Sequence, residues 1–253
     1  MIQLIDTHSH LCDGAFAKDL ADVIANARKA GVERIITVSE TLADARRNLE
    51  LAEKHPELLP AAGLYPAYTD IEAAADLHEF IRKNRDRLAA VGEVGLDYRV
   101  VEDEESREIQ RHILEGFVGL SSELDLVLNV HSRSAGRHAV ELLLKNGAKK
   151  VQLHAFDGKP GAALPAVEAG WFFSIPPSAV RSRQKQKLIK RLPLSCLLVE
   201  TDSPVLGPDP AVRNEPANAV VSLEIIAEIK KVPLKEAANA VYDNTLRLYG
   251  KHQ

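Results

Sequence analysis

The chain has few cysteines and no long apolar run. Cys12 and Cys196 are its only cysteines among 253 residues, too few for a disulfide framework, and they indicate reduced thiols. No apolar run approaches the roughly 18 residues needed to cross a bilayer. The N-terminus also lacks a basic segment followed by a long apolar one. These absences predict a cytoplasmic protein without a membrane partner.

The chain also lacks an excess of positive charge. Its formal net charge of -4 argues against binding nucleic acid through bulk positive charge, so phosphate binding would need a local cluster or bound cations. The 45% hydrophobic and 27% charged residues are typical of a folded globular protein. The length fits one large α/β barrel or two smaller domains, and composition does not decide between them.

Short apolar segments alternate with helical segments along the chain. The predicted strands cover residues 2–5, 34–38, 58–64, 89–94, 126–130, 150–154, 171–175 and 196–200. The predicted helices cover residues 17–30, 42–54, 71–88, 104–120, 137–146, 161–169, 178–192, 215–231 and 234–249, with Gly31 ending the first. Eight βα units with continuously apolar strands favour a closed (β/α)8 TIM barrel, one domain over residues 1–253, rather than a doubly wound sheet.

Two histidines follow the first apolar segment, two residues apart. In Asp6-Thr7-His8-Ser9-His10, the period of two along a strand would direct both imidazoles to the same side. His8 and His10 could then bind one metal ion, with Asp6 as a further ligand or as a group that orients them. An ordinary pair of strand-end histidines remains open as an alternative. Cys12 is a weaker candidate ligand, because a lone cysteine is more often a small buried thiol.

Further ligand types lie at the ends of other predicted strands. Glu93, flanked by glycines that permit close backbone approach, ends the fourth strand, and His131 follows the fifth. His154 ends the sixth strand and Asp202 follows the eighth. Each alone could be a helix-capping acid, an ion-pair acid or a rim histidine. In a TIM barrel, however, these strand ends meet at the active-site rim. Four imidazoles and two carboxylates there predict divalent cations, with Zn, Mn, Fe or Ni favoured over Mg.

The ordered motifs resemble those of the TatD-related metal-dependent deoxyribonucleases, within the amidohydrolase-like barrels. The matching motifs are D-T-H-x-H at 6–10, G-E-x-G-L-D-Y at 92–98, H-x-R at 131–133, the histidine at 154 and E-T-D-x-P at 200–204. The resemblance covers nearly the whole chain. It implies two adjacent cations, one held by His8, His10 and Asp202 and the other by His131 and His154, with Glu93 shared.

The resemblance implies hydrolysis of phosphodiesters, with DNA as the expected substrate. Two cations about 3.5–4 Å apart can generate a hydroxide near neutral pH and stabilise the attacking and leaving oxygens at phosphorus. Asp202 is then the expected general base, and Glu93 the catalytic bridge. Arg133 is expected to hold a phosphate oxygen, although a solvated surface arginine is the alternative. We expect a monomer that trims DNA from its 3′ end.

Three other segments bear on the substrate. Where many family members carry G-x-H-P, this chain has Gly63-Leu64-Tyr65-Pro66, so Tyr65 replaces the usual imidazole and could hydrogen-bond a phosphate or stack on a base. Arg213, on the long loop after the eighth strand, is a weaker phosphate-binding candidate, because the nearby Pro216 suits a simple helix start. The basic run from Arg181 to Lys187 is expected to be a solvated helix face.

Two other functions remain open on the residues alone. The same barrel and ligands could polarise the carbonyl of a small cyclic amide or lactone. No lysine is suitably placed for a carboxylated metal bridge, which leaves Glu93 and favours phosphoester chemistry. The chain could also keep its metal for structural reasons and bind a nucleic acid or a protein partner, but the full ligand set argues against that reading.

Overall fold

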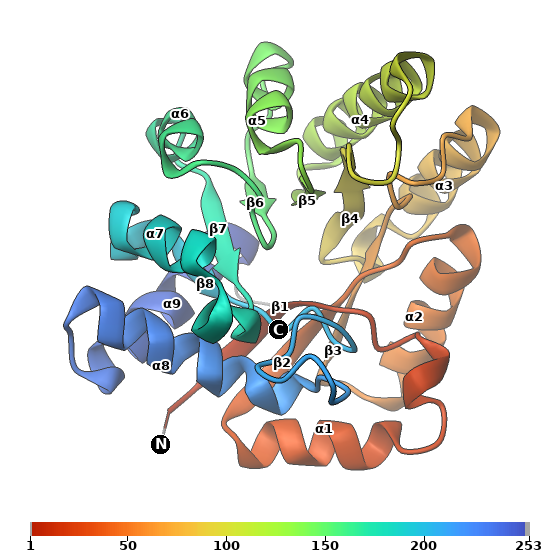
Figure 1. Cartoon of the computed structure of the whole chain (residues 1–253). Coiled ribbons are helices and arrows are strands. Elements are labelled where there is room, and N and C mark those ends of the chain that lie inside the picture. The colour runs from red at the N-terminus through yellow and green to blue at the C-terminus, as the bar shows by residue number, and fades with distance from the viewer. Residues whose placement is uncertain (1, 251–253) are drawn as a thin grey trace.

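Eight parallel strands form the centre of the protein in a computed structural model, which describes residues 2–250. The strands are β1 (Leu4–Ser9), β2 (Val32–Thr37), β3 (Leu58–Ala62), β4 (Ala90–Gly95), β5 (Val127–His131), β6 (Val151–Leu153), β7 (Phe172–Ile175) and β8 (Leu197–Val199). Each strand pairs in parallel with the next one along the chain. Figure 1 shows the helices arranged around this ring of strands.

The barrel closes between β8 and β1. The amide of Asp202 donates to the carbonyl of His8 at 2.8 Å, and the amide of His10 donates to the carbonyl of Ser203 at 2.8 Å. The hydroxyl of Thr7 donates to the carbonyl of Val199 at 2.9 Å. The prediction of a TIM barrel is confirmed. This closure brings His8 and His10, near the start of the chain, next to Asp202, near its end.

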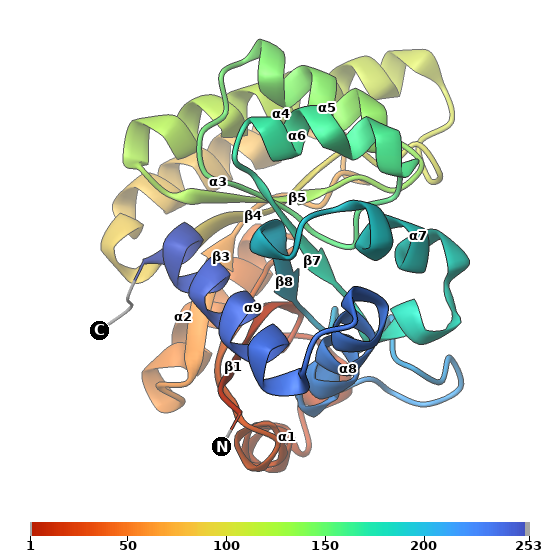
Figure 2. The same ribbon diagram turned by 90° about the vertical axis from the view of Figure 1, so that its left-hand side faces the viewer.

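The helices pack on the outside of the strands, as the second view shows (Figure 2). They are α1 (Leu20–Lys29), α2 (Leu42–Lys54), α3 (Ile71–Lys83), α4 (Glu104–Leu124), α5 (Gly136–Lys145), α6 (Leu164–Glu168), α7 (Arg183–Arg191), α8 (Ala219–Lys230) and α9 (Leu234–Tyr249). Within residues 2–250, none of these helices combines the length and apolar character that a membrane span requires.

The predicted boundaries are wrong at both ends of several elements: the helix predicted over 71–88 ends at Lys83, and the one predicted over 104–120 ends at Leu124. The first strand covers Leu4–Ser9 rather than residues 2–5, because its polar second half is also buried and pairs with β2. The helices predicted at 161, 178 and 215 begin instead with short 3₁₀ turns at Pro160, Pro177 and Pro216. Proline suits a first turn because it has no amide hydrogen to leave unbonded.

Two glycines behave as the sequence predicts. Gly31 follows α1 with a φ of +92°, and a side chain there would place its Cβ 2.5 Å from the carbonyl oxygen of Ile2. A Cβ on Gly92 would lie 2.7 Å from Cβ of Asn129. The glycine before Glu93 therefore lets β4 approach β5 closely, which brings Glu93 towards the ligands on β5.

Candidate metal centre

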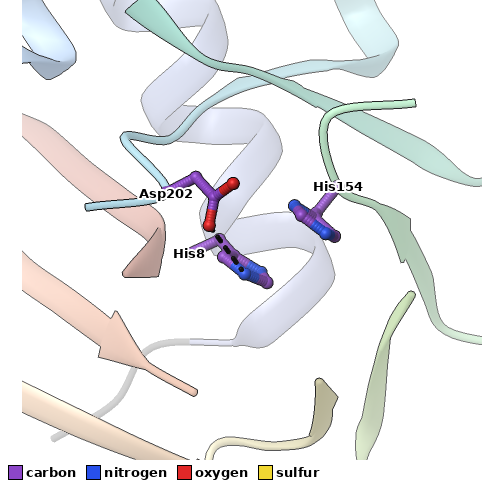
Figure 3. Close-up of side chains that lie close together, drawn as sticks. All are labelled: His8, His154 and Asp202. Atoms are coloured by element: carbon purple, nitrogen blue, oxygen red, sulfur yellow. Dashed lines mark ion pairs between the residues drawn. The ribbon is translucent and has the colours of Figure 1, made fainter. Parts of the chain in front are cut away.

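Six predicted ligands meet at the C-terminal rim of the barrel. His8 lies in β1, Glu93 lies in β4, and His131 ends β5. His10, His154 and Asp202 follow β1, β6 and β8, and Figure 3 shows His8, His154 and Asp202 pointing towards one another from three separate elements. All six are buried except His131, whose side chain is 12% exposed. The fold therefore concentrates the imidazoles and carboxylates of the whole chain in one place.

Glu93 lies between two pairs of histidines. Its Oε2 is 3.3 Å from Nε2 of His8 and 3.2 Å from Nε2 of His10. Its Oε1 is 2.7 Å from Nδ1 of His131 and 3.5 Å from Nε2 of His154. Each oxygen of one carboxylate thus faces a different set of imidazole nitrogens, as a ligand shared by two cations would.

Asp202 completes the group on the β1 side. Its Oδ1 lies 3.2 Å from Nε2 of His10 and 3.6 Å from Nε2 of His8. Its φ of +54° is left-handed, a conformation that aspartate adopts only in special turns. Ala155, directly after His154, is also left-handed, with a φ of +36°. Unusual backbone of this kind clusters at functional sites.

The donors fit divalent cations. Three overlapping groups have ligand atoms within 4.8 Å of one another: His8 with His154 and Asp202, His8 with His10 and Glu93, and Glu93 with His131 and His154. Nitrogen ligands with shared carboxylates suit transition metals or zinc. The buried rings of His8 and His154 also stack with their centroids 3.8 Å apart, which fixes the spacing between the two sides.

Two of these histidines have a hydrogen-bond partner on the nitrogen that faces away from the cluster. Nδ1 of His8 lies 2.9 Å from Oδ1 of Asn129, and Nε2 of His131 lies 3.1 Å from Oδ2 of Asp97. Such partners select the tautomer whose other nitrogen is free to bind a metal. Neither Asp97 nor Asn129 was among the site residues predicted from the sequence.

The other two histidines face carboxylates at longer distances. Nδ1 of His10 is 3.8 Å from Oε1 of Glu40. Nδ1 of His154 is 3.7 Å from Oε2 of Glu200 and has no hydrogen bond to any residue in the described part of the chain. Glu200 accepts bonds from the Ser174 hydroxyl at 2.5 Å and the Ala155 amide at 2.8 Å. Both carboxylates are oriented for a role beside a ligand histidine.

Asp6 and Cys12 lie outside the cluster. The carboxylate of Asp6 accepts bonds from the amide of Thr201 at 2.9 Å and from its hydroxyl at 2.5 Å, so it positions the loop that carries Asp202. The thiol of Cys12 donates to the carbonyl of Val38 at 3.6 Å, and burial raises its pKa to about 12. The structure therefore assigns Asp6 an orienting contact and Cys12 a packing position.

The protonation states of Glu93, Asp202 and His154 suit cation binding, whereas His8, His10 and His131, whose pKa values the carboxylates raise against the effect of burial, must lose a proton first. Burial alone would raise the pKa of Glu93, but His131, His10 and His154 hold it well below its ordinary value. The pKa of Asp202 is likewise lowered by His10 and His8 against the effect of burial. Burial and the nearby His8 lower the pKa of His154 to about 4. Two ionised carboxylates and a neutral imidazole are the forms that ligate metals.

A pocket of about 480 Å³ opens over these ligands. Tyr65 and Arg133 line it, as their predicted contact with substrate requires. The hydroxyl of Tyr65 donates to Oδ2 of Asp97 at 3.0 Å, and its ring packs edge-on against His131 with centroids 5.3 Å apart. Tyr65 therefore lies in the pocket and also contacts the partner of a ligand histidine.

Arg213 does not join the other candidates in this pocket. Its guanidinium donates to the two carboxylate oxygens of Asp19 at 2.9 and 2.6 Å and to Glu215 at 2.8 Å. It also lies over the ring of Phe16, 4.8 Å from the centroid. These contacts hold the long loop after β8 against the start of α1.

The expectation of a solvated basic face is wrong at Lys185. Arg183 and Lys187 are exposed, but Lys185 is only 9% exposed and lines the pocket. Its ammonium donates to the carbonyls of Phe156, at 2.9 Å, and Ala155. Burial lowers its pKa to about 8, with nearby carboxylates, Asp157 foremost, acting in the opposite direction.

Comparison with known proteins shows the family of the chain. The model of the family described as TatD related DNase matches residues 5–250. The chain belongs to this family. It is 42% identical to the human deoxyribonuclease TATDN3, over 99% of this chain and 96% of that protein. It is 30% identical to the metal-dependent hydrolase YabD of Bacillus subtilis, over 97% of this chain and 98% of that protein.

A solved structure extends the comparison to the fold. The TatD homologue YJJV of Escherichia coli superposes with a TM-score of 0.90 at 28% identity, covering 98% of each chain. Membership of the TatD-related family makes this chain a hydrolase that acts on phosphodiester bonds, and the clustered histidines and carboxylates account for its use of divalent metal.

Proposed function

We propose that this chain is a two-metal deoxyribonuclease that removes nucleotides from the 3′ end of DNA. The observation that supports it most directly is the position of Glu93, whose two oxygens face separate histidine pairs. A human relative named as a deoxyribonuclease, 42% identical over nearly the whole chain, supports DNA as the substrate class.

The two cations are assigned to two sets of ligands. His8, His10 and Asp202 would hold one, His131 and His154 would hold the other, and Glu93 would contact both. When bound, such a pair acidifies water and neutralises charge on the oxygens of a phosphodiester. Cations also account for how an acidic protein attracts DNA phosphate, since the formal net charge is -4.

The side chains of the pocket supply the remaining steps. Asp202, held ionised by neighbouring histidines, accepts the proton of the attacking water at its carboxylate. Arg133 lines the pocket and offers its guanidinium to a phosphate oxygen of the substrate. Tyr65 lines the same space, where a terminal base can stack on its ring.

The position of Glu93 also favours phosphoester over cyclic amide hydrolysis. The place between the histidine pairs is taken by a carboxylate from β4. Lys185, which lines the pocket, directs its ammonium to the carbonyls of Ala155 and Phe156. A carboxylated lysine bridge therefore has no support in the arrangement of the ligands.

The test uses single-stranded DNA labelled at either end. Metal-stripped protein is incubated with 3′-labelled and 5′-labelled strands, with Mn, Mg or Zn restored separately, beside a dihydropyrimidine amide. We expect metal-dependent release of the 3′ label as a mononucleotide, while the 5′ label shortens stepwise. Release of the 5′ label first would refute the direction, internal fragments would refute exonuclease action, and turnover of the amide with intact DNA would refute the substrate class.

A further inference from the structure

Lys185 is a buried cation whose hydrogen bonds are all to neutral groups. Its ammonium donates to the carbonyls of Phe156 and Ala155, and among the described residues it forms no ion pair with a carboxylate. Burying a charge without a directly paired counter-charge is unfavourable, so an anionic ligand that paired with Lys185 would offset this cost. An ammonium has three N–H groups, and two carbonyls leave one for the pocket that Lys185 lines.

The two cations of the pocket come from the same side of the barrel. Arg133 follows β5, and Lys185 contacts the loop after the neighbouring strand β6. The two loops are joined, because the amide of Ser134 donates to Oδ2 of Asp157 at 2.7 Å. In residues 2–250, Arg133 also lacks an ion pair with a carboxylate. This part of the pocket thus offers two cationic side chains to an anion, with the carboxylate of Asp157 beside them.

The opposite side of the pocket has different chemistry. Glu40 and Tyr65 follow β2 and β3, on the far side of the barrel from β5 and β6. The side chain of Glu40 is 43% exposed, and its carboxylate repels phosphate. Both cations therefore lie on the β5–β6 side of the pocket, together with Asp157, while the far side has an acid and an aromatic ring.

We propose that Lys185, with Arg133, binds a second phosphate of the substrate, next to the one that is cleaved. This rests on the proposed phosphodiesterase function. With this second site, the preferred substrates are oligonucleotides that carry a further phosphate beside the scissile bond, rather than isolated diesters. The polarity of the pocket places that phosphate towards β5 and β6 and the terminal nucleoside towards Tyr65.

The test compares substrates that differ by one phosphate. Manganese-loaded protein is assayed with bis(4-nitrophenyl) phosphate, TpT, pTpT and TpTp, using wild type, Lys185→Met and the control Lys187→Met, whose site is exposed on the same helix. We expect wild type to prefer pTpT, whose extra phosphate lies on the 5′ side of the scissile bond, over both TpT and TpTp. Lys185→Met should remove this preference by raising KM about 10- to 100-fold for that substrate, because a hydrogen bond to a charged group is lost. Lys187→Met should behave as wild type.

Turnover of the small diester shows whether Lys185→Met is correctly folded and loaded, and it should change less than threefold. Equal loss on all four substrates would give Lys185 a structural role, and a wild-type enzyme indifferent to the extra phosphate would refute the second site. Calorimetric titration with thymidine 3′,5′-bisphosphate measures binding at the second phosphate site without requiring catalysis. Absence of any hydrolysis would refute the proposed function. If the bisphosphate still binds more tightly than the monophosphate, and Lys185→Met loses this difference, the phosphate-binding role of Lys185 is supported independently.

Discussion

Replacing Asp97 should weaken one cation site and spare the other. Oδ2 of Asp97 contacts Nε2 of His131 at 3.1 Å, and His131 belongs only to the group formed with Glu93 and His154. The matching contact on the other side is made by the neutral amide of Asn129, 2.9 Å from His8. Asp97→Asn would therefore give His131 the kind of partner that His8 already has.

The expected magnitude follows from this comparison. Removing the outer partner of a ligand histidine costs about 10- to 100-fold in metal affinity, or about 1.4–2.7 kcal/mol. Asp97→Asn keeps an oxygen acceptor and loses only its charge, so we expect about a tenfold loss. Asp97→Ala removes the acceptor and also the hydrogen bond from Tyr65, so the loss should approach 100-fold.

The assay is calorimetric titration of metal-free protein with Mn or Zn, resolved into two binding steps. The metal affinity of one step should decrease from wild type to Asp97→Asn and again to Asp97→Ala. The affinity of the other step should stay within threefold of wild type. Asp86→Asn, at an exposed carboxylate, is the control and should leave both steps unchanged. Equal weakening of both steps, or no change in Asp97→Ala, would refute the assignment of His131 to a separate cation.

Three further outcomes are expected. Asp202→Asn should reduce phosphodiester hydrolysis at least 100-fold with the fold intact by circular dichroism, because the amide cannot accept the proton; unchanged turnover would contradict this role. Tyr65→His should alter the preference among substrates more than the bound metal measured by mass spectrometry, and a large loss of metal would contradict its placement. Glu93 and Asp97 raise the pKa of His131 to about 9, against the effect of burial. In metal-free protein this protonation stabilises the fold below about pH 6.5 and is lost as the pH rises towards 9. Metal binding at pH 7 should therefore release protons, and calorimetry in buffers of different ionisation enthalpy should detect them; an absence of release would refute this coupling.

The barrel was predictable because its strands are short apolar runs separated by regular helices. The helices from Leu42 to Lys54 and from Leu234 to Tyr249 were predicted at their observed boundaries. The first strand was misplaced because its second half carries Asp6 to Ser9, polar residues that look like the start of a loop. Their burial depends on pairing with β2 and on the closure with β8, which a local pattern does not contain.

The ligand set could be predicted since its members stand at strand ends, and a parallel barrel brings those ends together. The partners that orient the ligands could not. Asn129 and Glu200 reach ligands that are more than 40 residues away in sequence and on strands that are not neighbours, so their roles appear only once the barrel is closed. Lys185 did carry a local indication: Leu188 and Ile189 follow it at helical spacing on the buried face of α7.

The most direct test of the account is stepwise reconstitution of the metal-free protein with Mn while hydrolysis of bis(4-nitrophenyl) phosphate and bound metal are both measured. If Glu93 joins two cations, wild type should bind two equivalents, and activity should rise with the second. Glu93→Gln, which keeps the shape of the side chain, should bind fewer than two equivalents and lose activity. Full activity at one equivalent, or two tightly bound equivalents in Glu93→Gln, would contradict the two-metal centre.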